Sequence, residues 1–380
     1  WGHRNMGGLA IASQLRMRAN FRHPDVWFFG PDAQEFKEDL EQRWANHQDD
    51  MIARSFLWFE WYVLLGIKTT NVPGTGGLLG TGFDITFENV NRRGYSAMSI
   101  KPYYRLTSNY LRFLPIELKT GVEGTIVIPS QDPDVNDDIL GRYRYSRLPS
   151  GKALFFVTSL SVSADFRDNP LDPRKGVFAN IRGDYVQFLR TERQAEDVDR
   201  QSRYIKAMVS LSGYIPFARK ANVIALSASA GYMFHLIPES TAWADRYFYM
   251  GGVSTLRGFA SDAVVPQDIY YAGLDNPDIE VENELGGEAM FLLRSEVRHD
   301  FGKNVIGAVF AEAGNLWRDT KNFLRNKERD PAPWLLRPVG GLGIRYHTPV
   351  GPISFDVGLN LDKRKYESRW AWYFSIGSAF

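Results

Sequence analysis

Apolar and polar residues alternate along this chain in runs that are long for a globular protein. In residues 352–360 one face of such a run holds Ile353, Phe355, Val357 and Leu359, and the other holds Ser354, Asp356 and Gly358. A period of two is typical of a β-strand with one apolar and one polar face. Many runs reach about ten residues, the length that a tilted strand needs to cross a bilayer, whereas globular strands average about five or six.

The alternating runs predict an all-β fold, a transmembrane antiparallel β-barrel. We count about 16 runs, and bacterial outer-membrane barrels have an even number of strands. The runs are clear after Gly151 and weaker before it, where residues 34–48 are interpreted as a strand that extends above the membrane. Short turns alternate with long loops, which places both termini in the periplasm. A soluble β-sandwich is the alternative, but its strands are shorter.

Aromatic residues gather at the ends of the apolar faces, where barrels carry interfacial girdles. Two groups fit this interpretation: Trp243, Tyr247, Phe248 and Tyr249, and then Trp370, Trp372, Tyr373 and Phe374. We therefore expect one transmembrane barrel domain over residues 1–380 in the outer membrane, with lipids as its surroundings.

Composition excludes several other functions. Lys and Arg number 45 against 44 Asp and Glu, so no basic excess points to nucleic acid. The chain has no Cys, which rules out disulfides and thiolate metal sites. HExxH, GxSxG and GxxxxGK[ST] motifs are all absent. We expect no enzyme activity, no cofactor and no metal.

A loop of about 50 residues, 236–285, is too long to be a simple connection. It is rich in aromatic residues and Gly, which indicates an ordered loop folded into the lumen. Arg257 in this loop needs carboxylate partners in a confined space. By strand parity, Glu296 and Glu312 face the lumen on adjacent strands, and we hypothesise a latch between them and Arg257. The alternative is that the arginine motif arises by chance and the two glutamates are solvated.

The order of several motifs resembles the BamA/TamA superfamily of outer-membrane assembly barrels, most closely its TamA-like branch. RYFYMGGVSTLRGF resembles the Arg-Gly-Phe loop of that family, at Arg257, Gly258 and Phe259. GGEAMFLLRSE, VFAEAGNLW and RYHTPVGPISFDVG resemble the strands that follow, and FRDNPLDPRKGVF resembles a periplasmic turn. The resemblance implies that Glu296 and Glu312 are the acidic partners of Arg257. The family usually has Asp where this chain has Glu312.

The resemblance implies a barrel that inserts or translocates unfolded outer-membrane or secreted proteins, with periplasmic accessory proteins as further partners. POTRA domains, or an enzyme domain, are expected ahead of residue 1. Gly7, Gly8 and Gly377 would weaken a seam between the first and last strands, to which a client strand could add. Phe374, Ile376 and Phe380 resemble a C-terminal sorting signal. A two-partner secretion pore, an anchor for an enzyme domain and a diffusion channel remain alternatives.

Overall fold

A computed structural model provides the side-chain and backbone geometry of most of the chain. It describes residues 2–6, 11–21, 59–69, 72–92, 95–108, 110–111, 113–129, 151–170, 172–192, 202–218, 221–238, 240–275, 285–319, 335–348, 351–364 and 367–376. Residues 34–48, which we predicted to be a strand, lie outside these ranges.

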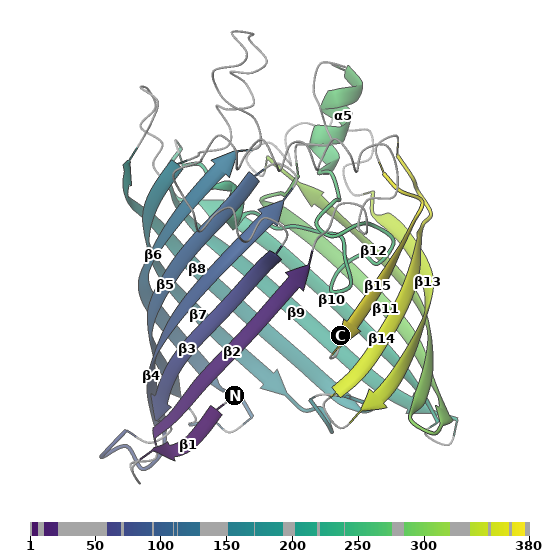
Figure 1. The fold of residues 1–380 in the computed structure, drawn as a ribbon, viewed down its shortest axis with the longest axis horizontal. Helices are drawn as coiled ribbons and strands as arrows, with labels where there is room; N and C mark the ends of the chain where they lie inside the picture. The colour runs from purple at the N-terminus through teal and green to yellow at the C-terminus, as the bar shows by residue number, and fades with distance from the viewer. Residues whose placement is uncertain are drawn as a thin grey trace. The chain divides into compact units, whose positions relative to one another are not determined.

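The described residues form one antiparallel sheet in which the strands follow each other in chain order (Figure 1). The strands are β1 Gly2–Met6, β2 Ile11–Phe21, β3 Phe59–Thr69, β4 Leu79–Arg92, β5 Tyr95–Ser108, β6 Ile116–Pro129, β7 Gly151–Asp165, β8 Gly176–Glu192, β9 Arg203–Phe217, β10 Asn222–His235, β11 Ala289–Gly302, β12 Val305–Trp317, β13 Arg337–Thr348, β14 Gly351–Asn360 and β15 Trp370–Ile376. The predicted all-β antiparallel class is confirmed, with 15 strands in the described part of the chain where about 16 were expected.

The alternation along the strands places apolar side chains outward and polar side chains inward. In β13, Leu342 and Ile344 are 64% and 53% exposed, whereas the neighbouring Arg345 is buried. In β14, Phe355 is exposed while Ser354 and Asp356 are buried. This is the reverse of a soluble protein, and it fits a sheet whose outer face meets lipid.

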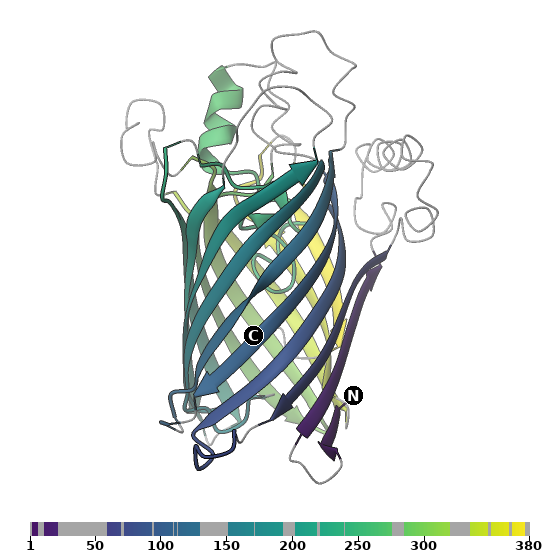
Figure 2. The same cartoon turned by 90° about the vertical axis from the view of Figure 1, so that its left-hand side faces the viewer.

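The chain divides into two compact units, and each is described by itself. Unit 1 comprises Trp1–Val162, Arg182–Ala207 and Phe234–Tyr247, and unit 2 comprises Ser163–Ile181, Met208–Met233 and Phe248–Phe380. In unit 1, β1 pairs with β2 at the start of the sheet (Figure 2). In unit 2, β11 to β15 pair in sequence with continuous registers.

The structure describes residues 236–238, 240–275 and 285–288 of the long connection between β10 and β11. It contains the short 3-10 helix η2, Ala244–Arg246, in unit 1 and the helix α5, Gln267–Asp275, in unit 2. Helix α5 stands beyond the strand ends (Figures 1 and 2), and its Ile269 packs with Val265 and Leu285. No helix in the described ranges is long and apolar enough to span a membrane.

The interpretation of one aromatic group as a lipid-facing girdle is wrong. Trp243 is only 4% exposed, and Tyr247 and Phe248 are also buried. The Trp243 ring contacts the rings of Phe155 and Phe188, so it belongs to the interior of unit 1. In the second group Trp370 and Phe374 are exposed as expected, but Tyr373 is buried. Aromatic composition alone does not distinguish a girdle from a docked loop.

The close packing of β6 against β5 gives a test of the strand register. A Cβ atom at Gly121 would lie 2.0 Å from the carbonyl oxygen of Pro102, whereas Gly183 in β8 has open space. Gly121→Ala should therefore destabilise the protein by about 1–3 kcal/mol through overpacking. Gly183→Ala, the matched control, should stay within about 0.5 kcal/mol of the wild type. Urea unfolding of the membrane-embedded protein measures both, and equal effects would contradict the register.

Candidate functional site

The pairing of β11 with β12 brings the two predicted acidic residues onto one buried face. Glu296 lies opposite Phe310 in this ladder, and Glu312 lies opposite Arg294. Both carboxylates are buried, because alternate residues of each strand point to the same side of the sheet. The two acids are thus diagonal neighbours on the interior face of unit 2.

Arg257 reaches both of these acids from the long loop and is completely buried, with 0% exposure. Its backbone N–H and its Nε each donate to Glu312, to Oε2 and Oε1 respectively, at 2.8 Å. Its Nη1 donates to Glu296 Oε2, also at 2.8 Å. The guanidinium carbon lies 3.5 Å from the centre of the Phe310 ring. Charge-assisted bonds of this kind fix both the side chain and the backbone of the loop.

The Glu312 carboxylate accepts two hydrogen bonds from Arg257, one at each oxygen. One carboxylate oxygen takes the Arg257 backbone N–H and the other takes its Nε. Among the described residues, Glu312 Oε2 accepts a hydrogen bond only from Arg257. Glu312 Oε1 also accepts one from Arg294 Nε, at 3.0 Å. The Glu312 carboxylate therefore links the loop to the paired strands β11 and β12.

Four more charged groups complete what we call the Arg257 cluster, and strand alternation would have placed all of them inward. Arg294 also donates to the loop carbonyls of Ser254 and Val253, at 3.3 and 3.2 Å. Arg345 Nη2 donates to Glu296 Oε2 at 2.7 Å, and Asp356 Oδ2 lies 3.4 Å from Arg257 Nη1. The cluster has the guanidinium groups of Arg257, Arg294, Arg298 and Arg345 and the carboxylates of Glu296, Glu312 and Asp356.

Gly258 and Phe259, the next two residues of the loop motif, lie on the last strands. A Cβ atom at Gly358 of β14 would lie 2.2 Å from the carbonyl oxygen of Arg257, so the two backbones approach closely only because glycine is there. The hydroxyl of Tyr373 in β15 donates to the carbonyl oxygen of Phe259. The Phe259 ring faces the Arg337 guanidinium at 5.1 Å. The loop is thus held on β13, β14 and β15 as well as on β11 and β12.

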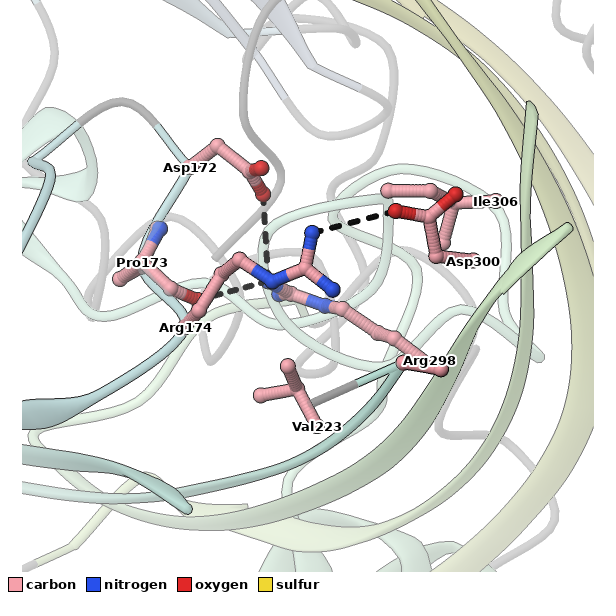
Figure 3. A pocket seen from close by; sticks show the side chains of 8 residues that line it. Asp172, Pro173, Arg174, Val223, Arg298, Asp300 and Ile306 are labelled. Atoms are coloured by element: carbon pink, nitrogen blue, oxygen red, sulfur yellow. Dashed lines mark hydrogen bonds and ion pairs between the residues drawn. The ribbon is translucent and has the colours of Figure 1, made fainter. Parts of the chain in front are cut away.

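The turn between β7 and β8 carries the charged network further. Arg298 donates to Glu296 Oε1 at 2.7 Å, and its Nη1 lies 3.9 Å from Asp172 Oδ1 and 3.5 Å from the Pro173 carbonyl oxygen (Figure 3). Arg174 and Asp300 line one small pocket together with Arg298 and Asp172, and there Arg174 pairs with Asp300 at 3.2 Å (Figure 3). Asp172 therefore brings a fourth carboxylate to the edge of the Arg257 cluster.

Asp168 organises this turn from within. Its Oδ1 accepts the backbone N–H groups of Asn169, Arg174 and Lys175 at 2.9, 3.0 and 3.1 Å. Burial tends to raise the pKa of the Asp168 carboxyl, but these N–H groups together hold it below the usual value for Asp. Gly176 closes the turn at a φ of 109°, a conformation that suits glycine.

The other predicted site residues are only partly described. Phe374 is exposed opposite Phe355, and the backbone of Ile376 lies opposite Ile353. Gly7, Gly8, Gly377 and Phe380 lie outside the described residues. Within the described ranges, no group of three or more His, Cys, Asp or Glu residues is arranged to hold a metal ion.

Comparisons with known proteins give a family and a fold. The chain matches the Omp85 superfamily domain over residues 80–380. BamA from Haemophilus ducreyi lacking POTRA domains 1–3 is similar in structure, with a TM-score of 0.63 and 19% identity over 84% of this chain and 62% of that chain. CdiB from Escherichia coli has a TM-score of 0.53 and 14% identity over 98% of this chain and 57% of that chain. The chain spans less than two thirds of either protein.

A double-mutant cycle tests whether Arg257 and Glu312 act as one unit. Removal of either partner leaves a buried charge unpaired, which typically costs about 3–5 kcal/mol, so Arg257→Ala and Glu312→Ala should couple by about 1–3 kcal/mol. The exposed pair Arg182 and Asp184, 2.8 Å apart, is the control and should couple by less than about 1 kcal/mol. Additive effects at Arg257 and Glu312 would contradict the clustered arrangement.

The lowered pKa of Asp168 predicts how the β7–β8 turn responds to acid. Above about pH 3.9, the pKa of Asp in an unfolded chain, the ionised Asp168 carboxylate stabilises the turn. Because its pKa is lower in the folded protein, this stabilisation is lost as the pH falls through that lower pKa. Hydrogen-exchange protection factors of the Arg174 and Lys175 amides should drop below about pH 4. In Asp168→Asn they should be low at every pH. Equal protection in both proteins at pH 6 would refute the role of the carboxylate.

Proposed function

Because the chain belongs to the Omp85 superfamily of outer-membrane β-barrels, we propose that it inserts other proteins into the outer membrane or translocates them across it. Its clients would be unfolded outer-membrane or secreted proteins. The observation that supports this function most directly is the docking of the Arg257 loop on the last strands of the sheet, through Glu312, Gly358 and Tyr373. No catalytic step is part of the proposal.

The proposed working part is a seam between the two end strands of the sheet. In the described part of the chain β1 and β15 stand at the two ends of the strand order. β15 pairs with β14 from Leu359↔Trp370 to Ile353↔Ile376. The edge strand of a sheet can template a client strand by β-augmentation. Gly7, Gly8 and Gly377 are the proposed weak points of this seam.

The proposed role of Arg257, Glu296 and Glu312 is that of a latch beside the seam. The latch fixes the loop on β11 and β12, and Tyr373 extends the same attachment to β15. The wall on the C-terminal side of the seam would therefore stay rigid while β15 exchanges partners. Phe374, Ile376 and Phe380 would serve as the sorting signal of the chain itself.

Periplasmic domains ahead of residue 1 and separate accessory proteins complete the proposal. They would deliver clients from the periplasm, where we place both termini. Export of one dedicated partner, as in a two-partner secretion pore, is the alternative, and the CdiB fold is the observation that favours it. Because the identity is 14%, that likeness concerns the fold and leaves the client undefined.

Closing the seam with a covalent bridge tests this function in the full-length protein. Residues 1–380 hold no Cys, so within this part of the protein a cross-link can join only the introduced pair, one Cys at positions 2–6 and one at positions 371–375. Cells that carry the cross-linked protein should contain less folded outer-membrane protein, as measured by heat-modifiable migration in gels. A thiol reductant should restore the level.

Ser295→Cys with Ala311→Cys is the matched control, because these residues already face each other in the paired strands β11 and β12. This bridge should leave the level of folded outer-membrane proteins unchanged. An unchanged level in the seam-bridged protein would reject the insertion function. Loss of a single secreted protein, with all other outer-membrane proteins intact, would establish the secretion alternative.

A further inference from the structure

A second part of the long loop, residues 240–247, is held on the strands of unit 1. Trp243 meets the Phe155 ring edge-on, with centroids 5.6 Å apart, and stacks on Phe188 at 6.4 Å. The Tyr95 hydroxyl donates to the carbonyl oxygen of Ala244 at 3.1 Å. Ser202 Oγ donates to the carbonyl oxygen of Thr241 at 2.5 Å. These contacts place the segment on β5, β7, β8 and the start of β9.

Arg246 is the charged centre of this segment. Its Nη1 pairs with Glu123 of β6, and its guanidinium carbon lies 4.6 Å from the centre of the Phe155 ring. Both side chains of the ion pair are almost completely buried. Removing one partner of a buried ion pair destabilises the folded protein strongly, because the other charge stays buried without a partner.

Lys206 of β9 supports the same segment from its backbone side. Its Nζ donates to the carbonyl oxygens of Arg246 and Tyr247, at 2.6 and 3.4 Å. These carbonyls lie at the C-terminal end of η2, where the last C=O groups have no donor within the helix. Arg246 Nε also lies 3.2 Å from Asp245 Oδ2. The Arg246 guanidinium therefore lies between two carboxylates, those of Glu123 and Asp245.

We propose that Arg246 is a second anchor of the loop, a positioning residue that holds residues 240–247 on unit 1 independently of Arg257. Among the residues that the structure describes, the two arginines share no partner: Arg246 pairs with Glu123, whereas Arg257 pairs with Glu296 and Glu312.

Between the two anchors the chain turns at Gly251 and Gly252. Gly251 and Gly252 both have positive φ values, 114° and 105°, and a Cβ atom at Gly251 would lie 2.2 Å from the Ala260 carbonyl oxygen. If the two anchors are independent, opening the Arg257 latch leaves residues 240–247 in place. The importance of that arrangement for client insertion rests on the proposed function, but the anchor itself does not.

Labelling of single cysteines in the full-length, membrane-embedded protein tests the two anchors separately. Ala242→Cys reports on the Arg246 segment and Leu256→Cys on the latch segment, since both positions are completely buried and the chain has no other Cys. Arg246→Gln should speed maleimide labelling at position 242 by about tenfold or more, with less than about a twofold change at position 256. Arg257→Gln should do the opposite.

Joint acceleration at both positions in either variant would overturn the proposal, because the loop would then be one docked body. Unchanged labelling at position 242 in Arg246→Gln would overturn it as well. These readouts do not use client insertion, so the anchor and the proposed function can fail separately.

Arg246→Lys separates the ion pair from general packing, and heat-modifiable migration identifies any variant that fails to fold. The lysine keeps the positive charge opposite Glu123 but loses the planar group that lies over the Phe155 ring, so labelling at position 242 should be slower than in Arg246→Gln and faster than in the wild type. Glu123→Gln should accelerate it as Arg246→Gln does. If Arg246→Lys labels as fast as Arg246→Gln, the ion pair is not the anchor.

Discussion

The burial of charge on the inner face of the sheet is the constraint on which this structure depends. A sheet with its apolar side chains turned outward must fill its interior with polar groups, and a buried charge is tolerated only when it is paired. Arg257 meets this demand with two carboxylates at 2.8 Å. The same pairing positions a loop that has little regular secondary structure of its own.

Buried ion pairs accompany the packing of apolar side chains at the places where the loop meets the strands. Around Arg257 the attachment spans β11 to β15, and around Arg246 it uses β6 and β9. Both arginines also lie over aromatic rings, Phe310 and Phe155. Glycines supply the close backbone approach that such docking needs, as Gly358 does beneath Arg257.

The sequence predicted the part of this arrangement that follows from strand parity. Alternation placed Glu296 and Glu312 on one inner face, and the loop motif supplied Arg257. Parity equally placed Asp356 inward, but which inward residues touch a given loop atom depends on the register of distant strands. The assignment of Trp243 to the lipid interface is wrong for a similar reason. Local composition does not reveal that Trp243 contacts Phe155, a residue far away in the chain.

Photo-cross-linking along the end strand tests the central claim of a templating seam most directly. A photoreactive amino acid would be placed in turn at positions 371–375 of the full-length protein during client synthesis. The account predicts adducts with an outer-membrane protein client that vary in yield with a period of two, since alternate residues of a strand face opposite sides. Adducts with this chain alone, or client adducts without periodicity, would contradict it.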